Sequence, residues 1–298
     1  MYKAQYKLSS SCFLFVLPAA LLVSFVIAYP IVYAVYLSFT NKVIGRVSFS
    51  FVGAENYIAW IYREDFWRTF KNTFLIAGAT LLLGICFGLP LALALQRFEK
   101  LKNIIGAIIL IPWIVPTVIS ILVWAWMFNP NVGLISWVLQ RLRIITSPIP
   151  WLSVPSLALV AIIIVSAWRR IPYFGVSLNA ALAEVPQELY EAAAIDGANA
   201  LQQFVYITLP AIKGILFLVS VLTFIETSYD FALVYILTRG GPAGATEVIS
   251  VKTFIVAFNA GQLARGITIP ILAFPIFAPA IWLITRRMLA KWASGGLA

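Results

Sequence analysis

The sequence predicts an all-α membrane protein, built as a polytopic bundle of transmembrane helices. Of its 298 residues, 62% are hydrophobic, and the mean hydropathy is +0.96. Charged residues make up 11% of the chain, well below the roughly 25% of an ordinary soluble domain. Several apolar runs reach the length of about 20 residues that crosses a bilayer as a helix. A membrane β-barrel would instead show alternating hydrophobicity. We therefore expect one transmembrane domain covering residues 1–298.

The composition also excludes several classes of function. The net charge is +10, but the basic residues lie mainly in loops and at the ends of spans, and no nucleic-acid-binding module is recognisable. Histidine is absent, which removes the commonest metal ligand and general base. The two cysteines, Cys12 and Cys86, lie in apolar runs and suggest no disulfide framework. There is no G-x-x-x-x-G-K-[ST] motif. We expect no catalytic residue, no metal site, no bound cofactor and no nucleic-acid partner, and any ATP-driven step would need a separate ATPase chain.

Six membrane spans are expected, each from an apolar run. They lie near residues 12–39, 72–95, 104–128, 156–176, 212–237 and 263–285. The first follows Lys3 and Lys7 and imitates a signal peptide. It is about 28 residues long, against the 7–15 of a signal-peptide core, so we interpret it as an uncleaved span.

The connecting segments carry weaker signals. Aromatic residues at helical spacing predict short surface helices at 56–62 and 66–70, where interfacial packing explains them better than a binding role. A glycine-rich turn is expected at 240–244 and a surface or re-entrant helix at 248–258. The short basic turn 97–102 and the basic tails favour an orientation with both termini in the cytoplasm.

The stretch from Glu184 to Gly214 is the longest one with a soluble character. It holds four of the eleven acidic residues, namely Glu184, Glu188, Glu191 and Asp196. The pattern predicts two short helices. Pro186 suits the first turn of one, and Gly197 can take the left-handed conformation that ends it. The second piece runs from Ala200 to Ile207, and Pro210 is expected to stop it.

Two interpretations of this stretch are open on spacing alone. A helix of small residues edged with carboxylates is suited to being gripped by a partner, because Glu191 can accept charge-assisted hydrogen bonds from a partner's arginine. An ordinary connecting loop between two spans is the other interpretation.

A family resemblance favours the first interpretation. The spacing Glu191-Ala192-Ala193, then Gly197, then Ile207-Thr208-Leu209-Pro210 resembles the "EAA loop" of the membrane subunits of ABC importers. The resemblance implies a type I ABC importer permease fold, in which the loop 180–210 faces the cytoplasm and docks in a groove of an ATPase subunit. The coupling residues that it implies are Glu191, Ala192, Ala193, Asp196, Gly197, Ile207, Leu209 and Pro210.

The resemblance extends over most of the chain, to the carbohydrate-importer branch of these permeases. The matching segments are Leu17-Pro18, Tyr29-Pro30, Leu37–Asn41, Phe51–Tyr57, Asn72-Thr73, Trp168–Tyr173 and Leu237–Pro242. Arg239 departs from the pattern, since the family usually has glycine there and arginine takes a positive φ poorly. The resemblance implies a bacterial inner-membrane location, a second homologous permease chain forming a heterodimer, two copies of an ATPase that uses ATP and Mg²⁺, and an extracytoplasmic solute-binding protein.

Polar groups within the fifth span are candidates for the substrate path. Glu226 and Asp230 are four residues apart and would share a helical face, with Tyr229 beside them. They either line a translocation cavity, where carboxylates accept hydrogen bonds from sugar hydroxyls, or form interhelical ion pairs with Arg169 or Arg170. The candidate substrate path comprises Glu226, Tyr229, Asp230, Arg169, Tyr173 and Trp124. For Trp124, packing is the better explanation.

The sequence thus predicts the permease subunit of an ATP-driven carbohydrate importer, surrounded by membrane lipid. The alternative is an ion-coupled secondary transporter of a small polar solute, which would need a coupling-ion site and usually internal repeats. A third possibility, the membrane anchor of an enzyme complex, is disfavoured by the intramembrane carboxylates.

Overall fold

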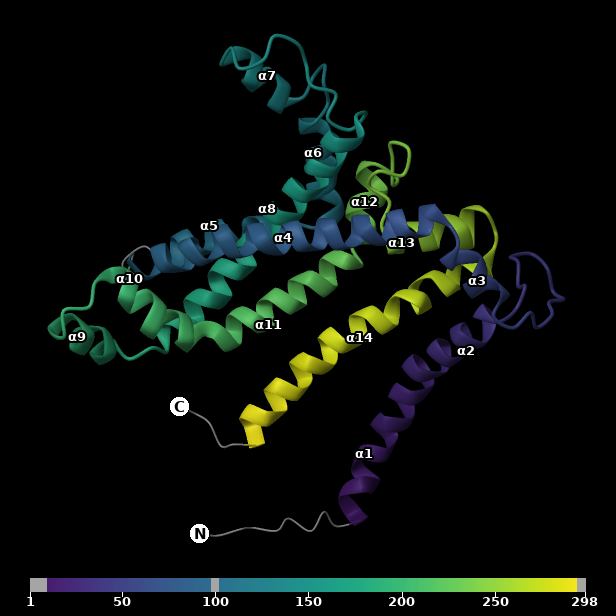
Figure 1. Cartoon of the computed structure of the whole chain (residues 1–298), viewed down its shortest axis with the longest axis horizontal. Helices are drawn as coiled ribbons and strands as arrows, with labels where there is room; N and C mark the ends of the chain where they lie inside the picture. The colour runs from purple at the N-terminus through teal and green to yellow at the C-terminus, as the bar shows by residue number, and fades with distance from the viewer. Residues whose placement is uncertain (1–9, 98–101, 294–298) are drawn as a thin grey trace. The chain divides into compact units, whose positions relative to one another are not determined.

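The structure, a computed structural model, describes residues 10–97 and 102–293 (Figure 1). Lys3, Lys7 and Lys100, on which the expected orientation partly depends, lie outside this range. The described residues are helical, apart from turns, loops and one β-bridge between Thr40 and Phe51. They form two compact units, one within residues 10–62 and 253–272 and the other within residues 63–97, 102–252 and 273–293.

The first unit contains the predicted first span. α1 (Ser10–Val23), the π-helix η1 (Ser24–Ala28) and α2 (Tyr29–Ser38) follow one another without a break, and Phe15–Ser38 is long and apolar enough to cross a membrane. The predicted span at 12–39 is therefore confirmed. Neither Pro18 nor Pro30 interrupts the helix.

The segment after α2 folds back and is held by buried polar bonds. Asn56, in α3 (Glu55–Ile61), donates from Nδ2 to the carbonyl oxygens of Ser38 and Thr40, both at 2.8 Å. The indole nitrogen of Trp60 donates to the carbonyl of Arg265 at 2.8 Å. Asn56 and Trp60 are both buried, so their role is structural, as expected for packing rather than binding. π-helix η3 (Ile255–Asn259) also lies in this unit.

The second unit carries the remaining spans and the loop with the EAA motif. Its helices are α4 (Glu64–Arg97), α5 (Lys102–Ile114), α6 (Thr117–Met127), α7 (Leu134–Arg141), α8 (Pro155–Ala183), α9 (Gln187–Ile195), α10 (Ala200–Gln203), η2 (Phe204–Thr208), α11 (Leu209–Ser228) and α12 (Phe231–Leu237). α13 (Ile249–Phe254) and α14 (Leu263–Ala293) cross the boundaries between the units.

Several of the predicted element boundaries are wrong. The predicted surface helix 66–70 is the first part of α4, which begins eight residues before the expected span. The expected third span is two helices, α5 and α6, bent by 85°. The bend follows from Pro116, because a proline disfavours the helical conformation of the residue before it. The expected fifth span ends at Ser228, and α12 follows after a break.

Within the described residues, four helices are long and apolar enough to span a membrane, and five if the bent pair α5–α6 counts as one. They are Phe15–Ser38, Glu64–Gln96, Pro155–Ala183 and Ala200–Ser228. α14 coincides with the predicted sixth span, but within the described part only Leu263–Pro275 meets the apolar criterion, and that is too short. Six spans therefore remain a prediction.

α4, α8 and α11 pack together around the core of the second unit. Their buried residues include Ala92, Phe174, Leu178, Leu182, Ile212 and Val219. Gly84 and Gly88 let α4 approach the ring of Phe174 closely. A Cβ at Gly88 would lie 2.3 Å from the Cβ of Phe174, and one at Gly84 would lie 2.6 Å from its ring.

The beginning of α4 is clamped to the loop after α12. Asn72 donates from Nδ2 to the carbonyl of Gly244 at 3.1 Å and to that of Glu247 at 3.3 Å. Thr73 accepts from the amide of Ile249 at 3.1 Å. The matched pair Asn72-Thr73 therefore holds the chain that follows the matched segment Leu237–Pro242, although 172 residues separate Asn72 from Gly244.

Arg239 lies in that loop and takes a left-handed conformation, with φ of 54°. Its amide donates to the carbonyls of Val234 and Tyr235, at 3.0 and 3.1 Å. Arg239 therefore adopts the left-handed backbone conformation for which the family usually has glycine. Its two hydrogen bonds stabilise this conformation, because they close the end of α12.

Candidate functional site

The EAA motif lies on two short helical pieces that connect α8 to α11. In Figure 1 these pieces, α9 and α10, lie together near the end of α8. α9 ends where Gly197 takes φ of +82°, and the amide of Ala198 returns to the carbonyl of Ala193 at 2.8 Å. Asn199 then starts α10 through a reciprocal pair of hydrogen bonds with Gln202. The predicted first helix, the break at Gly197 and the start of a second helix at Ala200 are confirmed.

Pro210, however, does not stop the second helix. The chain is helical without interruption from Ala200 to Ser228, and Pro210 lies in the first turn of α11. The π-helix η2 immediately before it explains this difference. In an α-helix, a proline lacks the N–H of one hydrogen bond, and its ring clashes with the preceding turn. The π-helical turn has a different hydrogen-bond pattern in that preceding turn, so the helix can continue through Pro210.

The two halves of the motif have different surroundings. Glu191, Ala192, Asp196 and Gly197 are exposed, whereas Ala193, Ile207 and Leu209 are half-buried. The carboxylate of Glu191 accepts a hydrogen bond from Gln187 at 3.1 Å and remains open to solvent. The acidic, small-residue half is thus presented outward, and the apolar half holds the loop against the rest of the unit.

Sequence reasoning missed the exposed apolar residues of this loop. Ile195 is 87% exposed, next to the motif residue Asp196, and Leu201 and Tyr206 are also largely exposed. Single exposed apolar residues are common on protein surfaces, whereas a contiguous apolar patch marks an interaction site. The sequence carried a signal for Ile195. It lies three residues after Ala192 and therefore continues the apolar face of the same helix.

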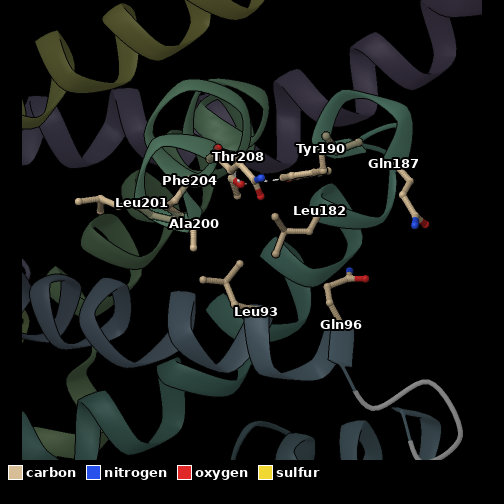
Figure 2. Close-up of a pocket in the computed structure, with 11 residues that line it drawn as sticks. Leu93, Gln96, Leu182, Gln187, Tyr190, Ala200, Leu201, Phe204 and Thr208 are labelled. Atoms are coloured by element: carbon tan, nitrogen blue, oxygen red, sulfur yellow. Dashed lines mark hydrogen bonds between the residues drawn. The ribbon is translucent and has the colours of Figure 1, made fainter. Parts of the chain in front are cut away.

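A cavity of about 660 Å³ lies at the base of this loop (Figure 2). It is formed where the ends of α4 and α8 meet α9 and α10–η2. Its lining residues are Leu93, Gln96, Leu182, Val185, Gln187, Tyr190, Ala200, Leu201, Gln203, Phe204 and Thr208. The hydroxyls of Tyr190 and Thr208 bond to each other at 3.0 Å, joining α9 to η2.

The second group of candidates forms a polar node where four helices meet. Arg169 donates from Nη1 to Asp230 at 3.0 Å and from Nη2 to the hydroxyl of Thr117 at 2.8 Å. Arg170 is paired with Glu226. Both arginines belong to α8, and their partners lie on α6, on α11 and between α11 and α12.

The expected shared helical face of Glu226 and Asp230 is wrong. Asp230 lies beyond the end of α11 and caps α12, accepting from the amide of Leu233 at 3.1 Å. Both ion pairs of the second interpretation are present. Because the carboxylates border a break in the helix, the pairs also hold that break in place. The role of these residues in a substrate path stays a prediction.

The aromatic candidates lie on both sides of the node. Tyr173 stacks on Trp113 with ring centroids 6.1 Å apart, and Trp124 meets Trp168 edge-on at 5.5 Å. Tyr229 is exposed at the end of α11. Trp124 also lines a cavity of about 450 Å³, whose lining is otherwise Val115, Ser120, Val123, Met127 and Trp168.

Comparison with known proteins identifies the family. Residues 84–292 match the model of the "Binding-protein-dependent transport system inner membrane component". The chain belongs to this family. It is 36% identical over 272 residues to the trehalose/maltose transport system permease protein MalF of Thermococcus litoralis, covering 91% of each chain.

Solved structures agree on the fold. The present chain is similar in structure to a chain of a bacterial ABC transporter involved in the import of the acidic polysaccharide alginate. The TM-score is 0.79, the sequence identity is 19%, and the match covers 93% of the present chain and 94% of the other. A second structure of an alginate transporter, in complex with an alginate pentasaccharide-bound periplasmic protein, matches with a TM-score of 0.76, 19% identity and the same coverage. The type I importer permease fold expected from the resemblance is thereby supported.

Proposed function

We propose that this protein is the permease subunit of an ATP-driven ABC importer for a carbohydrate. It forms half of the translocation path and is coupled to a separate ATPase through the loop 180–210. The chain is a transport component, and ATP is used by the partner subunit.

The observation that carries the coupling role is the exposed EAA helix. α9 contains no buried residue and presents the carboxylate of Glu191 beside small side chains, which allow a partner's backbone to approach closely. The left-handed Gly197 sets the angle between α9 and α10. A rigid, solvent-facing helix of this kind is suited to transmit the movement of a docked ATPase to α8 and α11, between which it is tethered.

The carbohydrate cargo is inferred from relatives. The curated relative is named for trehalose and maltose, and the similar solved structure imports alginate. Uncharged and acidic sugars are thus both carried by proteins that resemble this one.

The remaining partners follow from the same family. A periplasmic protein is bound to one of the similar structures, which supports a solute-binding protein as a partner here. We further propose a heterodimer with a second homologous permease, two ATPase copies, and an orientation with both termini in the cytoplasm of a bacterial cell.

The substrate path is proposed to pass the polar node. Glu226, Asp230 and Arg169 place hydrogen-bonding groups beside two helix breaks, and broken helices are typical of substrate sites in transporters. Tyr173, Tyr229 and Trp124 supply aromatic surfaces near it. An ion-coupled secondary transporter would leave the EAA helix unexplained, and the family match does not support it.

The coupling role is tested in the assembled complex. We would co-express the chain with its second permease, ATPase and binding protein, and measure ATP hydrolysis with a panel of sugars. The Glu191→Ala, Gly197→Asp double variant should lose sugar-stimulated hydrolysis. As a control, Glu55→Gln removes an exposed carboxylate on α3 and should leave hydrolysis unchanged. Failure of the ATPase to associate with the wild-type chain would overturn the EAA assignment.

A further inference from the structure

We propose that the polar node selects an uncharged, polyhydroxylated cargo and rejects an acidic one, because the accessible charge at the node is the carboxylate of Glu226. This inference rests on the carbohydrate importer function proposed above. It adds the charge class of the cargo, which the names of the relatives leave open.

The two ion pairs differ in how far their side chains are exposed to solvent. The side chain of Glu226 is 53% exposed, whereas that of Arg170, its partner, is 14% exposed. In the other pair, Arg169 and Asp230 are 16% and 15% exposed. Of the four charged side chains, only one carboxylate is therefore largely accessible.

The position of the node indicates what that carboxylate faces. Arg169 lies 14 residues after Pro155 and 14 residues before Ala183, the two ends of α8 (169 − 155 = 14 and 183 − 169 = 14). At 1.5 Å per residue, this places it about 21 Å from each end, near the middle of a membrane-spanning helix. An ionised group at that depth faces the interior of the bundle or a water-filled cavity rather than lipid.

The arginines are not available to attract an acidic cargo. Arg169 uses two of its nitrogens for Asp230 and Thr117, and Arg170 is engaged by Glu226. Both guanidinium groups are mostly covered. A positive charge that is paired and covered offers little attraction to an anionic sugar.

The exposed carboxylate, in contrast, matches sugar hydroxyls. An ionised carboxylate only accepts hydrogen bonds, and a hydroxyl can donate one. A uronate or sulfonate at the same place would bring a second negative charge up to this carboxylate inside the membrane span, where repulsion is stronger than in bulk water. Arg170 is paired with Glu226 but mostly covered, so it offsets this repulsion only in part. We expect this repulsion to weaken binding of an acidic sugar about tenfold relative to its uncharged counterpart.

The test is a binding measurement on the assembled transporter without its binding protein, so that the selectivity of that protein does not enter. The probes are maltose, trehalose and a disaccharide of the same size that carries one glucuronic acid, at pH 7 and low salt. The wild-type transporter should bind one of the two uncharged probes, and its Kd for that probe should be about tenfold lower than its Kd for the acidic disaccharide. Glu226→Gln should reduce this preference several-fold by improving binding of the acid, while Glu55→Gln should leave it unchanged.

A double variant that exchanges the two charges controls for an effect of misfolding. Arg170→Glu combined with Glu226→Arg keeps the ion pair but exposes a cation, so the preference should reverse toward the acid. The proposal is overturned if wild type binds the acid as tightly as the uncharged sugar, or if both variants keep the wild-type ratio. If Glu226→Gln disrupts assembly and this double variant restores it with an unchanged ratio, Glu226 is only structural and the proposal also fails. If wild type couples to its ATPase but binds no sugar of either charge, the carbohydrate assignment fails instead.

Discussion

Gly197 is the residue on which the shape of the coupling loop depends. With φ of +82°, it ends α9 and redirects the chain into α10, and a Cβ added to it would meet nothing within 4 Å. The only cost of a side chain there is therefore the left-handed backbone, which disfavours residues with a Cβ by about 1–2 kcal/mol.

We predict that Gly197→Ala lowers sugar-stimulated ATP hydrolysis, because the loop relaxes toward another backbone conformation. Gly45 offers a matched control, since its φ is +83° and a Cβ there also meets nothing. Gly45→Ala should carry a similar backbone cost, measured by thermal unfolding, but should leave hydrolysis intact. Equal loss of hydrolysis in both variants would show that the effect is general destabilisation.

Ile195 is the most exposed apolar side chain of the loop, and we predict that it anchors the ATPase. Ile195→Asn should raise the Kd for the isolated ATPase subunit at least tenfold, since residues that anchor an interface typically contribute about 2 kcal/mol or more. Binding to the purified permease pair in nanodiscs measures this directly. Ile58→Asn, at another exposed isoleucine on α3, should not change the Kd.

At the scale of elements, the packing of α4 against α8 depends on glycines in α4. Gly88→Ala would place a methyl group 2.3 Å from Phe174, and overpacking of this kind typically costs about 1–3 kcal/mol. We predict a corresponding loss of stability in detergent unfolding. Gly78→Ala in the same helix meets nothing within 4 Å and should be neutral or stabilise, since alanine favours helices over glycine. A stable Gly88→Ala variant would mean that the two helices can separate freely.

The clamp at the start of α4 contains a largely buried charge network. Lys252, whose side chain is 12% exposed, donates to Asp65 at 2.8 Å and to Glu247 at 3.0 Å. We predict that Lys252→Met destabilises the protein by about 3 kcal/mol, because it leaves a buried carboxylate without its cation. Adding Glu247→Gln should recover part of this loss. Lys71→Met, at an exposed position on α4, is the control, and an equal effect there would contradict a specific role for the clamp.

At the scale of the whole molecule, orientation in the membrane decides which loops meet which partners. The number of Lys and Arg residues is nearly equal on the two sides of the expected topology, so the density of charge in short loops is the better guide. The EAA loop must face the cytoplasm if it binds an ATPase, and the loop after α2 must then face the other side if α5 and α6 together form one span.

Cysteine labelling tests this topology. In a background in which Cys12 and Cys86 are replaced by serine, we predict that Val47→Cys, at a 93% exposed position, reacts with an impermeant maleimide on intact cells. Gln202→Cys in the coupling loop should react only after the membrane is permeabilised. Labelling of both positions on intact cells would place the two loops on the same side and contradict the proposed coupling to a cytoplasmic ATPase.

The sequence by itself determined the features that depend on local chemistry. Continuous apolar runs predicted the helical membrane class and the approximate positions of most spans, because burial in lipid requires them at every point along a helix. The break at Gly197, the helix before it and the start of the next helix at Ala200 were also predictable, since they rest on backbone preferences of single residues. The motif itself led to the family.

The tertiary structure decided which residues meet and where helices break. Hydropathy shows that Arg169 lies in a span but not that it joins Thr117 to Asp230, which are 113 residues apart in the chain (230 − 117 = 113). Pro210 was expected to stop a helix, and a π-helical turn accommodates it. Glu226 and Asp230 were placed on one helical face, and a helix end separates them. These outcomes depend on the packing of distant helices against one another, and a local pattern contains no information about those neighbours.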